Sequence, residues 1–245
     1  MGDVALVLVA ATATAAATGL GALPFLLTRR PGRAWLGRAN ALAVGFMVGA
    51  SVGLLLEGAR EGIWRTLLGI ALGWLAMGPA HRFLGSRGDV RVGSLRGLDA
   101  TRALAVIGVM TVHSFAEGVG VGVSFGSGEA FGLLIALAIA VHNIPEGLAI
   151  SLVLVPRGAR VATAAAWSVF SSLPQPLMAL PAFAFVSAFA AVLPAGLGFA
   201  AGAMAWLALT QLAPEAVEAG SRRALVALAA PCAGAMVALQ LLLVG

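Results

Sequence analysis

Long apolar runs separated by short loops occupy nearly all of the chain's 245 residues. The runs are roughly 18–25 residues long, which is the length that an α-helix needs to cross the core of a bilayer. Membrane β-strands are shorter, at roughly 9–11 residues. A soluble domain carries about 25% charged residues, whereas this chain has 10% charged and 60% hydrophobic residues. The pattern predicts an all-α, polytopic membrane protein and excludes a soluble fold.

Eight transmembrane helices are predicted, and they form a single transmembrane domain over residues 1–245. Residues 161–214 carry no charge and are too long for one span, so we place a turn at 193–196, which includes a proline and a glycine. Arg29 and Arg30 follow the first run instead of preceding it, which favours a span over a signal peptide. The predicted spans cover about residues 4–27, 39–57, 62–80, 99–124, 129–155, 161–189, 194–217 and 223–244.

Thirteen of the 15 basic residues, all of them arginines, lie in or beside alternate loops of this arrangement. These loops join the first span to the second, the third to the fourth, the fifth to the sixth and the seventh to the eighth. Because positive residues favour the cytoplasmic side, both termini are expected on the outer side of a cell membrane, plasma or inner. The net charge of +5 therefore indicates topology and not nucleic-acid binding.

Two polar motifs interrupt the fourth and fifth predicted spans. His113 and Glu117 are four residues apart, and so are His142 and Glu146. This spacing puts each pair on one face of a helix. An ionisable residue in a membrane costs roughly 2.5–3.5 kcal/mol or more, so such residues point to function. Two facing pairs would offer imidazole and carboxylate ligands to a divalent metal such as zinc or iron.

Both pairs are expected near the middle of the bilayer. At about 1.5 Å per residue, His113 and His142 each lie roughly 20 Å into their spans. Gln175, in the sixth predicted span, reaches a similar depth. Pro145 and Pro174 remove backbone donors nearby, which a membrane protein tolerates where the backbone lines protein or a polar cavity.

Structural roles are the alternative for each of these polar residues. The His/Glu pairs could join helices as buried polar contacts, although Ser or Asn would do so at lower cost. Gln175 could make an interhelical hydrogen bond, while Asn143 and Ser114 could be weak ligands or hydrogen-bonding neighbours. Carboxylates near span ends are expected at the interface, where they could collect ions: Glu57, Glu215 and Glu218.

The motifs resemble those of the ZIP family of zinc and iron permeases, in its bacterial branch. HNIPEG at 142–147 matches the family's fifth-span motif residue for residue, and HSFAEG at 113–118 resembles its fourth-span motif HNxPEG. Residues 172–176 resemble the sixth-span segment, 45–49 the glycine-rich start of the second span, and 214–216 an end of the seventh. The resemblance extends over the whole chain.

The resemblance implies a bundle of eight helices, with spans one to three and six to eight as inverted repeats around the other two. It implies uptake of a divalent cation, zinc first and iron, manganese or cadmium as alternatives, with no organic cofactor. The principal metal ligands would be His113, Glu117, His142 and Glu146. The adjacent second-metal position, or groups supporting the first, would be Ser114, Asn143 and Gln175.

Three residues depart from the family pattern. Ser114 stands for Asn, Ala116 for Pro, and Gln175 for the usual Glu. An amide in place of a carboxylate removes one negative charge from a site for a dication, so we expect one competent metal site with a weakened or absent neighbour.

Other functions remain open on the sequence alone. The same residues could form a non-transporting metal-binding scaffold or sensor, an intramembrane metal-dependent hydrolase, or a cation channel. No nucleotide-binding motif or nucleophile arrangement indicates an enzyme. The expected partners are the metal ion and the lipid bilayer, with no nucleic acid, and the sequence is compatible with a homodimer.

Overall fold

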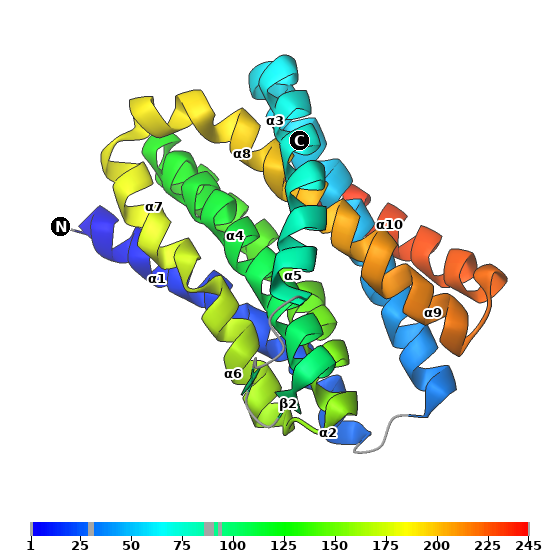
Figure 1. Ribbon diagram of the computed structural model, residues 1–245. Helices are drawn as coiled ribbons and strands as arrows, with labels where there is room; N and C mark the ends of the chain where they lie inside the picture. Colours follow the sequence, from blue (N-terminus) through cyan, green and yellow to red (C-terminus); the bar gives the residue numbers. More distant parts are fainter. Residues whose placement is uncertain (1, 29–31, 86–90, 93–94, 245) are drawn as a thin grey trace.

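The computed structural model describes residues 2–28, 32–85, 91–92 and 95–244 (Figure 1). One short antiparallel pair joins β1 (Arg91–Val92) to β2 (Leu95–Arg96). All other regular elements in these ranges are helical, which confirms the all-α prediction.

The helical elements follow one another in this order: α1 (Gly2–Thr18), η1 (Gly19–Ala22), α2 (Pro24–Leu27), α3 (Arg33–Gly85), α4 (Gly97–Ser127), α5 (Glu129–Leu154), η2 (Val155–Arg157), α6 (Val161–Ser172), α7 (Pro174–Ala184), α8 (Val186–Leu207), η3 (Ala208–Leu212), α9 (Ala213–Ala219) and α10 (Arg222–Val244). Six continuous helical segments of the described chain are long and apolar enough to cross a membrane. This confirms a polytopic membrane protein, while the count of eight spans stays a prediction.

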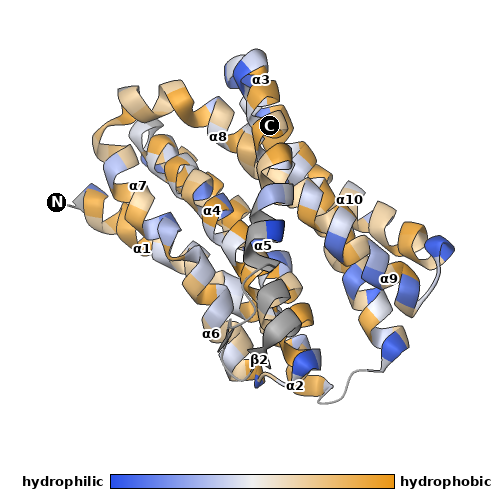
Figure 2. Cartoon of the chain, in the orientation of Figure 1, coloured by the Kyte–Doolittle hydropathy of each residue, from blue (hydrophilic) through white to orange (hydrophobic). Residues whose placement is uncertain are grey.

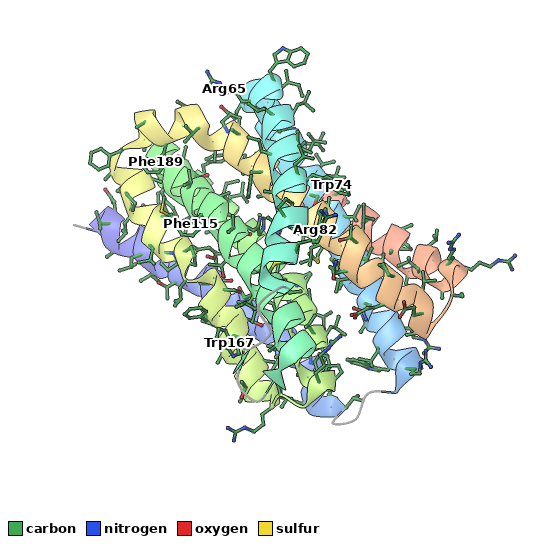
Figure 3. The ribbon with its side chains drawn as sticks, viewed as in Figure 1. Arg65, Trp74, Arg82, Phe115, Trp167 and Phe189 are labelled. Carbon is green, nitrogen blue, oxygen red and sulfur yellow. The ribbon has the colours of Figure 1, made fainter. Side chains whose placement is uncertain are left out.

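The second and third predicted spans both lie in α3. Its apolar stretch of 47 residues would be about 70 Å long as one straight helix, more than twice the thickness of a bilayer core. Helical geometry is interrupted at Gly62, with φ 171° and ψ 88°. The chain reverses direction at Gly62, and this turn is the cyan upper end of the α3 hairpin in Figure 1. A Cβ placed on Gly58 would meet Thr66 across the turn. Arg65 lies at this same end (Figure 3).

The turn predicted at residues 193–196 is wrong. These residues lie inside α8, and the helix breaks earlier, at Phe185, whose φ of −123° and ψ of 48° are not helical. Pro194 continues the helix and packs beside Gly62 at the turn of α3. A proline costs a membrane helix one backbone hydrogen bond but does not end it where neighbouring elements pack around the site.

The helices form two groups. The first comprises α1 and α4–α7, and the second comprises α3 and α8–α10, each group packing mainly within itself. In the second group, glycines of α3 and α8 pack against each other's backbone carbonyls, where any side chain would collide: Gly69, Gly73, Gly198 and Gly202. Such close approach is typical of helix packing in lipid. Figure 2 shows hydrophobic residues over most of the helix surfaces and hydrophilic residues gathered mainly toward the helix ends.

Candidate metal centre

The four residues of the two polar motifs meet inside the first group of helices. His113 and Glu117 lie on α4, and His142 and Glu146 lie on α5. These four side chains, named the His/Glu cluster below, are between 0% and 3% exposed. The i, i+4 spacing gives each helix one face with two ligands, and the packing of α4 on α5 brings the two faces together.

The distances within the His/Glu cluster suit one metal ion. His113 Nε2 is 2.8 Å from Glu146 Oε1 and 3.3 Å from Glu117 Oε1. His142 Nε2 is 3.2 Å from Glu146 Oε1, 3.7 Å from Glu117 Oε1 and 3.4 Å from His113 Nε2. Zinc–ligand bonds of about 2.0–2.2 Å place tetrahedral ligand atoms roughly 3.3–3.6 Å apart. One ligand atom from each residue can therefore approach a zinc-sized ion, since the four atoms lie within 4.8 Å of one another.

Two carboxylate oxygens of the His/Glu cluster are buried acceptors. Within the described part of the chain, neither Glu117 Oε1 nor Glu146 Oε2 has a hydrogen-bond donor. Buried acceptors of this kind are rare because the lost hydration costs free energy. A cation coordinated by the His/Glu cluster would compensate that cost at Glu117 Oε1, so the donor set fits a divalent metal.

A glycine follows each glutamate of the His/Glu cluster, and both glycines are required by close packing. A Cβ on Gly118 would lie 2.5 Å from the carbonyl oxygen of Gln175 on α7. A Cβ on Gly147 would collide with the carbonyl oxygen of Thr18 on α1. The last position of each motif thus lets a neighbouring helix backbone approach directly beside a ligand.

Gln175 and Asn143 form a hydrogen-bonded network on one side of the His/Glu cluster. Gln175 Nε2 donates to Glu117 Oε2 at 2.6 Å, and Gln175 Oε1 accepts from Asn143 Nδ2 at 3.1 Å. Asn143 Nδ2 also donates to the Thr14 carbonyl at 2.8 Å, and Thr14 Oγ1 lies 2.6 Å from Gln175 Oε1. The interhelical hydrogen bond considered for Gln175 is present. The amide group ties α1, α4, α5 and α7 together around Glu117.

Ser114 and Thr14 are two further buried polar residues near the His/Glu cluster. Ser114 is buried, yet its hydroxyl has no partner among the residues that the structure describes. Thr14 was not predicted as part of the site. Its signal was faint, a set of threonines in the apolar first run, and its partners lie 129 and 161 residues away in the sequence.

A cavity of about 50 Å³ leads from the His/Glu cluster toward one end of the molecule. Glu117 and His142 line it together with Glu57, Arg60 and Gln240, and it has room for a few water molecules. Glu57 was expected at the interface. It is partly exposed and lines the same cavity as two of the candidate ligands.

Comparison with known proteins finds similarity to proteins named as zinc transporters. The family model described as the ZIP zinc transporter matches residues 93–242, which include the whole His/Glu cluster. A protein of Arabidopsis thaliana, named as a candidate zinc transporter, is 47% identical over 212 residues, which are 85% of this chain and 34% of that protein. The zinc transporter GufA of Myxococcus xanthus is 34% identical over 235 residues, 88% of this chain and 90% of its own length. The chain thus spans about a third of the plant relative and most of the bacterial one.

Proposed function

The chain belongs to the ZIP family of zinc transporters, and on this premise we propose that it carries a divalent metal cation, zinc first, through the His/Glu cluster into the cytoplasm. ZIP is a family of transporters and not of enzymes, which removes the intramembrane hydrolase from the alternatives. Iron, manganese and cadmium are further candidate ions because imidazole and carboxylate ligands accept all of them.

The observation that carries this proposal is the convergence of four buried ligand atoms, one from each cluster residue, all within 4.8 Å of one another. Burying two imidazoles and two carboxylates in a bilayer is costly unless a cation or a proton balances the charge. The names of the two relatives favour zinc as that cation.

The arrangement of the two helix groups supports a transport path. The His/Glu cluster belongs to the first group, while Glu57, Arg60 and Gln240 of the second group line the cavity that reaches it. An ion entering by this cavity binds between α4 and α5. It leaves on the opposite side after one helix group shifts against the other.

The distribution of arginines supports the direction and the location. The end of the molecule that carries Arg33, Arg157 and Arg222 is the cytoplasmic end under the positive-inside rule. The cavity with Glu57 then faces outward, as do both termini, in a plasma or inner membrane. Eight spans follow if α3 crosses twice and α6 with α7 crosses once.

The network around Gln175 supports a single metal per chain. The Gln175 amide donates a 2.6 Å hydrogen bond to Glu117 Oε2, so a neutral donor occupies the place where a second cation would share that carboxylate. Asn143 belongs to the same network, because its Nδ2 donates to the Thr14 carbonyl and to Gln175 Oε1.

The experiment that tests the proposal is metal uptake into proteoliposomes. Zn²⁺, Fe²⁺, Mn²⁺ and Cd²⁺ are each offered to the wild type, to Glu146→Ala and to the control Glu129→Ala, which removes an exposed carboxylate from the same helix. We expect Glu146→Ala to reduce zinc flux at least about tenfold because a ligand is lost, and Glu129→Ala to retain most of it. Zinc binding without flux in the wild type would instead establish a scaffold or sensor.

A further inference from the structure

A second polar cavity lies between the two helix groups at the arginine-rich end of the molecule. It has a volume of about 320 Å³ and receives residues from the start of α3, from the end of α5 with η2, and from α9. Its polar lining residues are Arg33, Asn40, Arg157, Glu215 and Glu218. None of these belongs to the His/Glu cluster.

An ion pair crosses this cavity. Arg157 Nη2 lies 3.4 Å from Glu215 Oε1, and Arg157 Nη1 donates to the Val153 carbonyl at 2.9 Å. Arg33 Nη2 donates to the backbone carbonyl of Glu218 at 3.2 Å. Arg157 closely follows the helix that carries His142 and Glu146, whereas Glu215 belongs to the other helix group. The ion pair therefore joins the two groups.

Asn40 supplies the second, independent observation. Its side chain lines the cavity and is 3% exposed, and its Oδ1 atom has no donor in the described ranges of the chain. A buried amide oxygen is unfavourable unless a hydrogen-bond donor or a cation binds to it. Together with the carboxylates of Glu215 and Glu218 it gives three oxygen ligands of the kind that hold divalent cations.

We propose that this cavity is a release-side site for a divalent metal cation, formed by Asn40, Glu215 and Glu218, with Arg157 as a tethered competitor. The inference rests on the proposed transport function, because the transported cation would bind at this site after it leaves the His/Glu cluster. Leu152, on the wall of the cavity, lies about 9 Å beyond Glu146 along α5.

The ligand chemistry suits release. The site lacks the imidazoles of the His/Glu cluster, and oxygen ligands hold zinc less strongly than nitrogen and oxygen ligands combined. A cation that binds Glu215 displaces the guanidinium of Arg157, and this breaks an ion pair between the helix groups. When the cation leaves, Arg157 returns to Glu215, which disfavours rebinding.

Calorimetric titration with Zn²⁺ on the purified full-length chain in detergent separates the two sites. The background is Glu117→Ala/Glu146→Ala, which disables the His/Glu cluster. We expect one weak zinc site to remain there, to disappear on adding Glu215→Gln with Glu218→Gln, and to weaken with Asn40→Leu.

Adding Arg157→Gln should increase the zinc affinity of this weak site roughly twofold to fivefold, since partly exposed ion pairs have modest strength. The matched control Arg160→Gln, on the exposed arginine three residues later, should leave it unchanged.

Each outcome bears on one proposal. Tighter binding in Arg157→Gln cannot come from misfolding, so it supports the release-side site. Unchanged affinity in Arg157→Gln or in Asn40→Leu would overturn it, because adventitious binding to exposed carboxylates depends on neither residue. The proposed transport function is tested separately, by zinc flux into proteoliposomes with the wild type and Glu146→Ala; the loss of the tight zinc site in the Glu117→Ala/Glu146→Ala background tests only the His/Glu cluster as a binding site.

Discussion

At the scale of single residues, the charge at position 175 decides what can bind beside Glu117. The Gln175 amide now satisfies Glu117 Oε2 at 2.6 Å without adding charge. A carboxylate in its place would set two acceptors at that distance, which is unfavourable unless a proton or a cation lies between them. Gln175→Glu therefore tests whether a second metal position can form beside Glu117.

Gln175→Glu should raise the number of zinc ions bound by the purified protein from one to two per chain, because the new carboxylate can share a cation with Glu117. Stoichiometry measured by elemental analysis after equilibrium dialysis checks this. Gln211→Glu is the control, since it adds the same charge away from the network of Gln175. A ratio of one in Gln175→Glu would show that Thr14 and Asn143, and not the missing charge, exclude the second ion.

At the residue scale, the sequence was enough to single out the four residues of the His/Glu cluster but not their neighbour Thr14. The spacing of the HxxxE pairs was enough to place each His and Glu on one face of its own helix, because i, i+4 geometry is local. That the two faces meet follows from the packing of α4 on α5. Thr14 could not be found in this way. Its contacts with Asn143 and Gln175 exist only after α1 packs on α5 and α7, and an apolar run with a few threonines does not reveal that packing.

At the scale of elements, close helix packing places the His/Glu cluster. Gly118 follows Glu117 on α4 and faces the backbone of Gln175, whereas a Cβ placed on Gly120, two residues later, would meet no described atom within 4 Å. The two glycines thus offer a matched pair on one helix, one at a tight contact and the other in open space.

Gly118→Ala should lower the thermal midpoint of the detergent-solubilised protein by several degrees. The added methyl must push α7 away, overpacking costs about 1–3 kcal/mol, and each kcal/mol shifts the midpoint of a chain of this size by about 2–4 °C. Gly120→Ala should have no such effect, and a helix-interior alanine favours stability by roughly 0.5–1 kcal/mol over glycine. Fluorescence-monitored melting of both variants checks the pair. Equal midpoints would mean that α7 yields to the methyl group without cost.

Element boundaries show why part of the fold escaped prediction. The apolar runs located the helices because membrane length and hydropathy are properties of the sequence alone. The turns were harder to locate. Proline and glycine at 193–196 suggested a turn, yet α8 runs through them while the chain breaks at Phe185. In a membrane, a break lies where neighbouring helices can satisfy the backbone, and that is set by tertiary packing.

At the scale of the whole molecule, helix α5 extends from the end near Asp3 to the end near Arg157. Asp3 and Glu129 line the same cavity, so the start of α1 lies beside the start of α5. The 26 residues of α5 extend about 39 Å to its other end, where Arg157 contacts Glu215. Glu129 and Glu215 therefore belong on opposite sides of a bilayer core about 30 Å thick.

This geometry, with the arginine distribution, predicts the orientation of the protein in the membrane. In a Cys232→Ala background, Glu129→Cys should react with a membrane-impermeant maleimide added to intact cells, because the end with Asp3 is expected to face outward. Ser221→Cys, in the exposed connection between α9 and α10, should react only after permeabilisation, because that end carries the arginines that favour the cytoplasm. Labelling of Ser221→Cys in intact cells, with no labelling of Glu129→Cys, would mean that the protein has the opposite orientation in the membrane. The cavity of Glu57 would then open to the cytoplasm and the proposed direction of transport would reverse.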